Sequence, residues 1–231
     1  MAASAADAPV GRFRKHRSLV LRVLSAVVLG PLLLAAIWFG FPWLDLVAAL
    51  AAPLIVSEWL NLTRGRPLRR LLAIVYSLAA IVALLWLRHQ PADGRETILW
   101  IVAVIWATDI GAFVVGRAAG GAKLAPRISP GKTWSGLIGG MAWAAVASAA
   151  MSYAFGLGHT VTLAAVGACL AIVGQIGDLL ESAAKRAAGV KDSGTLIPGH
   201  GGLLDRVDGL LAILVVVALI RLVVGGGWPW T

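Results

Sequence analysis

The chain has 231 residues, of which 59% are hydrophobic and only 13% are charged, and its formal net charge is +9. Soluble domains are about 45–50% apolar and about 25% charged, so this composition excludes an ordinary soluble protein. The single cysteine, Cys169, excludes an internal disulfide and any site built on a pair of cysteines.

Several apolar segments reach the length of about 20 residues that lets a helix cross a bilayer. Seven are expected, at about 19–39, 42–61, 70–88, 97–117, 135–155, 160–181 and 208–226. Only the turn-like FGFPW separates the first two, so the number of spans can lie between six and nine. Uniformly apolar runs favour helices over the alternating segments of a membrane barrel. We therefore expect an all-α, polytopic integral membrane protein.

The basic residues predict the orientation of these spans. Residues 1–18 are small and then basic, and we expect them to form a cytoplasmic arm. With the N-terminus inside, sixteen of the twenty Lys and Arg residues fall in cytoplasmic segments and the C-terminus lies outside. Topology and anionic membrane lipids explain this excess of bases, so nucleic acid is not an expected partner.

Polarity is concentrated in two long loops that face the cytoplasm in this topology, at 118–134 and 182–207. Both belong to a C-terminal region, 96–231, which follows the N-terminal transmembrane helices of 19–95. A functional site is therefore expected in the C-terminal region.

An acidic residue inside an expected span, Asp109, points to function, because ionisable groups within a membrane are costly. Gly111 follows it, where a backbone or a ligand could approach closely. The alternative is a carboxylate paired with an arginine for structure. We interpret Asp109 as a substrate-binding residue.

A polar stripe is expected at the end of the sixth span, in GQIGDLLESAAKR. Gln175, Asp178, Ser182 and Lys185 have i, i+3, i+7 and i+10 spacing, which places them on one helix face. A helix end wetted at the interface would explain Lys185 and Arg186. It would not explain Gln175 and Asp178, which lie deeper.

Carboxylates also gather where the seventh span begins. Asp205 and Asp208 share a helix face if the helix has started by then, and Asp178 precedes the same loop. One of them could simply stabilise the helix N-terminus. Together they form the hard-oxygen environment that suits Mg²⁺ with substrate phosphates.

Groups suited to binding phosphate surround these acids. The glycines of PGHGG can place N–H groups around an anion, and His200 could donate to a phosphate oxygen or carry a proton, although a lone histidine is more often structural. The expected anion-binding residues of this loop are Lys185, Arg186, Lys191, Gly201, Gly202 and Arg206.

The other cytoplasmic loop, GRAAGGAKLAPRISPGKTWSG, contains bases, glycines and hydroxyls but no acid. It is expected to be an anion-binding arm, with Arg117, Lys123, Arg127, Ser129, Lys132 and Thr133. Acids for a metal and bases for phosphates at one membrane face predict phosphoryl or nucleotidyl transfer, in which positioning and charge stabilisation dominate catalysis.

The segment SAAKRAAGVKDSGTLIPGHGGLLDRVD, residues 182–208, resembles the signature of the phosphatidate cytidylyltransferases. TDIGAFVVGR and LAPRISPGKTWSG resemble the upstream block of the same family. The resemblance implies that CTP and phosphatidate give CDP-diacylglycerol and diphosphate, in the inner membrane of a bacterium. Family members usually have a glutamate where Ser135 stands.

The resemblance also implies roles for the residues above. Asp178 and Asp205 would hold Mg²⁺, with Asp208 as a second choice and with a second cation such as K⁺. The expected catalytic residues are Asp178, Asp205, Asp208, Lys185, Arg206 and His200. The expected substrate-binding residues are Asp109, Arg117, Lys123, Ser129, Lys132, Thr133, Gln175, Ser182, Arg186, Lys191, Asp192, Gly201 and Gly202.

Two alternative functions are open from the sequence. One is a CTP-dependent enzyme acting on another lipid, and the other is an ion-coupled transporter, although transporters favour repeated halves and broken helices. A GxxxG spacing, Gly136 to Gly140, suggests helix packing within the chain or a homodimer face.

Overall fold

A computed structural model describes residues 27–156, 158–196, 201–225 and 228. Six helices of this part of the chain are long and apolar enough to cross a membrane, and a shorter apolar helix, Val27–Phe39, precedes them. The six are α2 (Trp43–Leu62), α3 (Pro67–Arg88), α4 (Gly94–Ala119), α5 (Trp134–Ala154), α6 (Thr160–Ala187) and α7 (Leu204–Val224). The predicted all-α, polytopic membrane fold is confirmed. The predicted arm, 1–18, and the start of the first expected span lie outside the described residues.

Two helices extend further into the second polar loop than the apolar pattern indicated. Helix α6 continues to Ala187 and α7 already begins at Leu204. The segment ESAAKRA consists mostly of good helix formers, so the helix persists after the apolar run has ended. Asp205 and Asp208 therefore both lie on helix α7, as their expected common face required.

The first polar loop contains a small antiparallel hairpin that the sequence pattern did not predict. Strand β1 (Lys123–Ala125) pairs with β2 (Ser129–Thr133), and the amide of Ile128 donates to the carbonyl of Ala125 at 3.1 Å in the connecting turn. Strands of three and five residues carry no readable alternation, and β2 contains both Pro and Gly, which are depleted in strands. The hairpin gives the expected anion-binding arm a defined shape.

Glycines allow α4 and α5 to pack closely. A Cβ added at Gly136 would lie 3.0 Å from the carbonyl oxygen of Ala112, and one at Gly140 would lie 3.0 Å from that of Thr108. Small residues permit such close approach between membrane helices. The GxxxG segment is thus used for packing within the chain.

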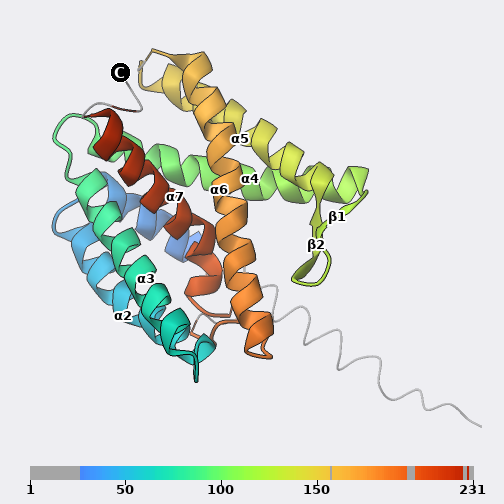
Figure 1. The fold of residues 1–231 in the computed structure, drawn as a ribbon. Coiled ribbons are helices and arrows are strands. Elements are labelled where there is room, and N and C mark those ends of the chain that lie inside the picture. Colours follow the sequence, from blue (N-terminus) through green and yellow to red (C-terminus); the bar gives the residue numbers. More distant parts are fainter. Residues whose placement is uncertain (1–26, 157, 197–200, 226–227, 229–231) are drawn as a thin grey trace, which may run out of the picture.

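Helix α6 occupies a central position in the bundle. Figure 1 shows it between α5 and α7, with the α2–α3 pair on the far side of α7 and the hairpin projecting from the end of the α4–α5 pair. Large apolar side chains such as Leu50, Val146 and Leu222 are exposed on the outside, as expected for surfaces that face lipid. The polar segments on either side of α6 are consequently brought towards the same helix.

Candidate functional site

Two neighbouring cavities lie along α6 and collect most of the predicted site residues. One, of about 600 Å³, lies beneath the hairpin, and the other, of about 500 Å³, lies between α4, α6 and the start of α7. Both are lined by Asp109, Gln175 and Asp178. The first also exposes Arg117, Lys123, Lys132 and Thr133, and the second also exposes Lys185, Asp192, Asp205, Arg206 and Asp208.

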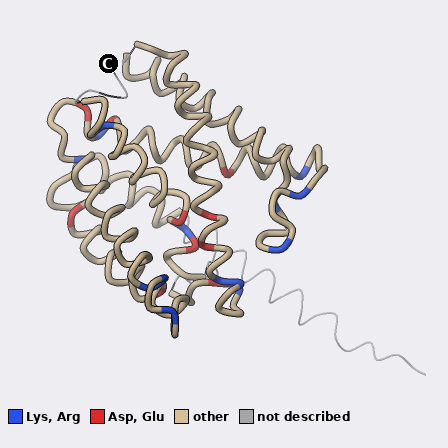
Figure 2. Tube along the Cα trace, in the orientation of Figure 1, with Lys and Arg blue, Asp and Glu red and all other residues tan. Residues whose placement is uncertain are grey.

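Charges of opposite sign meet in this region. Figure 2 shows acidic residues gathered along the facing parts of α6 and α7, with basic residues on the hairpin and at helix ends around them. Lys132 of β2 forms an ion pair with Asp178 of α6, at 2.5 Å between Nζ and Oδ2. The hydroxyl of Ser182 donates to the other carboxylate oxygen of Asp178 at 3.2 Å. Asp178 and Ser182 of the polar stripe expected on α6 are therefore hydrogen-bonded to each other, and Lys132 joins the hairpin to this stripe.

Lys185 connects the two acidic helices. Its ammonium forms ion pairs with Glu181, one turn earlier on α6, and with Asp205 on α7, the latter at 2.6 Å. The side chains of Glu181 and Asp205 are only 2% and 6% exposed, so both carboxylates depend on a buried counter-charge. Lys185 thus neutralises acidic groups of the protein itself in this structure.

Asp205 also organises the loop that precedes it. Its Oδ2 accepts hydrogen bonds from the amides of Ser193, at 3.0 Å, and Gly202, at 2.8 Å. Gly201 has a φ of +89°, and a Cβ there would lie 2.7 Å from the same oxygen. Glycine is therefore required at 201 by the backbone conformation and by the close approach of Asp205.

Asp208 and Asp109 differ from Asp178 and Asp205, which form ion pairs with lysines. Oδ1 of Asp208 accepts from the amide of Gly209 at 2.7 Å, and no ion pair joins either aspartate to another described residue. Both carboxylates line the same cavity as Asp178. These acids are available for a ligand or a cation that enters the cavity.

Seven predicted residues that the structure describes do not line these two cavities: Arg127, Ser129, Ser182, Arg186, Lys191, Gly201 and Gly202. Arg186 instead donates to the carbonyls of Ile128 and Val190, both at 3.2 Å, which joins α6 to the hairpin turn and to the following loop. His200 lies outside the described residues.

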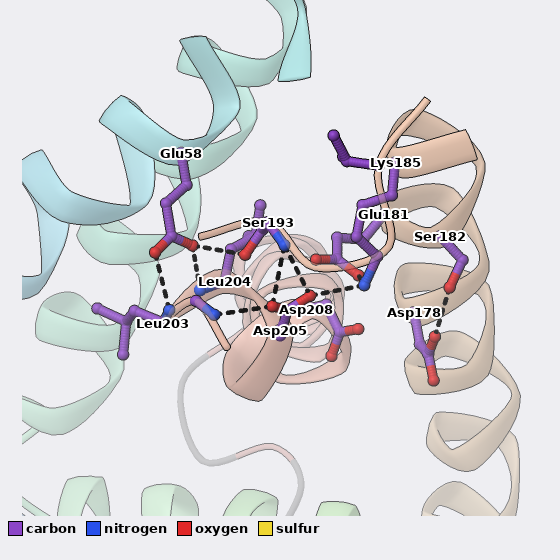
Figure 3. A network of polar contacts seen from close by, with 12 residues as sticks. Glu58, Asp178, Glu181, Ser182, Lys185, Ser193, Leu203, Leu204, Asp205 and Asp208 are labelled. Carbon is purple, nitrogen blue, oxygen red and sulfur yellow. Dashed lines mark hydrogen bonds and ion pairs between the residues drawn. The ribbon is translucent and has the colours of Figure 1, made fainter. Parts of the chain in front are cut away.

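Glu58 on α2 was not identified from the sequence, yet Figure 3 shows its carboxylate directed into the same polar network. It accepts hydrogen bonds from Ser193, Leu203 and Leu204. The rule that singled out Asp109, an ionisable group within an expected span, also applies to Glu58 and would have found it.

The sequence is similar to a known family and to named relatives from bacteria. Residues 65–224 match the model of the cytidylyltransferase family. The phosphatidate cytidylyltransferase of Brucella suis biovar 1 (strain 1330) is 50% identical over 165 residues, which cover 70% of this chain and 58% of that protein. Its counterpart in Rickettsia bellii (strain RML369-C) is 35% identical over 205 residues, covering 86% of this chain and 88% of that protein. The protein of that name in Pseudomonas aeruginosa is 41% identical over 201 residues, covering 86% and 71%. The chain thus spans 58% of the length of the Brucella relative and larger shares of the other two.

Proposed function

Since this chain belongs to the cytidylyltransferase family, we propose that it transfers the cytidylyl group of CTP to phosphatidate. An oxygen of the lipid phosphate attacks the α-phosphorus of CTP, and the bond from that phosphorus to the β-phosphate bridging oxygen breaks. Diphosphate leaves with the electron pair, and CDP-diacylglycerol is the other product. The nucleophile is already an anion, so charge stabilisation and positioning matter more than a strong general base.

The observation that carries this proposal is the pair of adjoining cavities with opposite character. The cavity beneath the hairpin is lined by Arg117, Lys123 and Lys132, which suit a triphosphate. The lining of the adjoining cavity includes five aspartates, together with Lys185 and Arg206. Asp109, Gln175 and Asp178 line both, so a ligand at this boundary meets the cationic arm and the acids together.

We propose that Mg²⁺ binds on the acidic side, at Asp178 and Asp205, with Asp208 as a further ligand and with room for a second cation such as K⁺. Carboxylate oxygens are the donors that Mg²⁺ favours, together with substrate phosphates. The described residues contain no preformed group of three His, Cys, Asp or Glu ligands, and Asp178 and Asp205 form ion pairs with Lys132 and Lys185. When bound, Mg²⁺ would neutralise charge on the leaving diphosphate. The donor set fits, provided that substrate phosphates draw the lysines away.

We further propose that this site faces the cytoplasm, in the inner membrane of a bacterium. The excess of bases in the loops at this end of the bundle supports that orientation. The glycines that suggested a homodimer, Gly136 and Gly140, pack against α4 of the same chain. A homodimer therefore stays a prediction that these two residues do not support.

The test uses purified protein in detergent with phosphatidate, Mg²⁺ and radiolabelled CTP. We expect label in the lipid phase and released diphosphate, both requiring phosphatidate and both lost in Asp178→Asn. Glu96→Gln is the matched control, because Glu96 pairs with Arg95 and lines neither cavity. Folded protein that labels no phosphatidate species would contradict the proposal. Label on a different lipid phosphate alone would assign that lipid as the acceptor.

A further inference from the structure

Glu58 is a buried acid in the N-terminal part of the chain, outside the 65–224 segment that matches the family model. It lies on α2 and is 6% exposed. An ionised carboxylate that is withdrawn from water must be compensated by hydrogen bonds or opposite charge. Its partners therefore indicate what it does.

The partners of Glu58 all belong to the loop before α7 and to the start of that helix. Oε2 accepts from the hydroxyl of Ser193 at 2.7 Å and from the amide of Leu204 at 2.8 Å, and Oε1 accepts from the amide of Leu203 at 2.9 Å (Figure 3). The first amides of a helix lack partners within it, and Leu203 has no side-chain oxygen to cap them. A carboxylate from α2 supplies the missing cap.

The loop backbone is shaped around this carboxylate. A Cβ at Gly194 would lie 2.8 Å from Oε1 of Glu58, and a Cβ at Gly202 would overlap Oε2. Two glycines from opposite ends of the loop thus allow its backbone to enclose one acidic group.

The same loop residues also hold Asp205. Ser193 donates its hydroxyl to Glu58 and its amide to Asp205, the latter at 3.0 Å. Gly202, which adjoins Glu58, donates its amide to Asp205 at 2.8 Å. Glu58 and Asp205 therefore both accept hydrogen bonds from this loop. Asp205 also forms an ion pair with Lys185 and lines the acidic cavity.

We propose that Glu58 is a positioning residue for the reaction: it fixes the loop that sets the orientation of Asp205 and Lys185. This inference rests on the proposed cytidylyl transfer. Glu58 lines neither of the two cavities, so it acts through Ser193 and the first turn of α7. Residues that orient ligands from behind a site in this way typically contribute about 10–100-fold to activity.

The test compares Glu58→Gln, Ser193→Ala and the double variant with wild type and with Glu96→Gln, which makes the same chemical change away from the site. We expect kcat to fall about 10–100-fold in Glu58→Gln with KM for CTP little changed, because positioning acts on the transition state. Ser193→Ala should lose less. The fold-decrease in kcat of the double variant should be smaller than the product of the two single decreases, because the two side chains form one hydrogen bond with each other.

Hydrogen exchange supplies a readout that does not depend on activity. We expect the amides of Ser193, Leu203 and Leu204 to exchange faster in Glu58→Gln, while amides of α5 exchange as in wild type. Wild-type kcat and wild-type exchange in Glu58→Gln would overturn the proposal. If that variant does not fold, unchanged kcat and exchange in Ser193→Ala would overturn it instead.

The two proposals fail in different ways. An inactive, folded wild-type protein would contradict cytidylyl transfer, whereas the exchange experiment would still report whether Glu58 holds the loop. An active wild type whose Glu58→Gln and Ser193→Ala variants are equally active would contradict the positioning role alone.

Discussion

The ammonium of Lys132 lies 2.5 Å from Oδ2 of Asp178, which joins the hairpin to helix α6. Their side chains are 18% and 33% exposed, so the pair is partly shielded from water. A base expected to bind phosphate and an acid expected to bind metal are thus paired with each other. If the proposed function is right, a bound nucleotide phosphate would pair with Lys132, and its cation would pair with Asp178.

Replacing Lys132 by Met should therefore weaken nucleotide binding. We expect KM for CTP to rise about 10-fold or more, the loss typical of a charge-assisted contact of about 1.5–3 kcal/mol. Steady-state kinetics with phosphatidate held saturating provides the measurement. Arg64→Met is the control, because Arg64 is exposed and lines neither site cavity. An unchanged KM for CTP in Lys132→Met would exclude Lys132 from the nucleotide site.

Lys185→Met should damage stability as well as activity. It removes the shared counter-charge of Glu181 and Asp205, and breaking a buried ion pair costs about 3–5 kcal/mol. A second change, Glu181→Gln, removes one of the stranded carboxylates. We expect the double variant to regain part of the lost thermal stability but none of the lost activity. Recovery of both would mean that Lys185 is only structural.

A second buried ion pair lies at the opposite end of α7. Arg221 donates to Asp93 at 2.6 Å, and their side chains are 4% and 10% exposed. Asp93→Asn or Arg221→Met should each lower the free energy of unfolding by about 3–5 kcal/mol. The double variant should lose less than the sum of the two, because neither charge is then left unpaired. Thermal melts in detergent give these values.

This pair should not take part in the reaction. We expect kcat per folded molecule in Asp93→Asn to match wild type at a temperature where both are folded. A large fall in kcat under those conditions would show that the C-terminal end of α7 affects the site.

Gly111 is expected to tolerate no side chain. An added Cβ would lie 2.6 Å from Cγ of Trp143 and 2.7 Å from the carbonyl of Gly139, so Gly111→Ala forces α4 and α5 apart. Overpacking of this kind costs about 1–3 kcal/mol, and Asp109 lies two residues away. We expect a lower melting temperature together with lower activity.

Gly30→Ala is the matched control for Gly111→Ala. It is also within a helix, and a Cβ there meets nothing within 4 Å. Alanine is the better helix former, so its melting temperature should be equal or slightly higher. Equal melting temperatures for Gly111→Ala and wild type would mean that the two helices can separate without cost.

Many residues of the candidate site could be predicted, because the signals that identify them lie in the sequence next to each residue. Asp109 and Asp178 are costly inside apolar spans, and the spacing of Gln175, Asp178, Ser182 and Lys185 places them on one helix face whatever surrounds that helix. Glu58 could have been recognised as an acid within a span, but its partners could not. They lie on a loop more than a hundred residues further along the chain.

The sequence by itself determined the membrane class, the expected helices and the acids and bases of the candidate site, because each depends on composition or on spacing along one helix. Only the tertiary structure decided that Lys132 meets Asp178, that Lys185 lies between Glu181 and Asp205, and that α2 caps α7 through Glu58. Those pairings depend on how closely helices pack and at what angle they cross. Helix packing is set by side chains from several segments acting together, such as the glycines between α4 and α5, so no single stretch of sequence contains it.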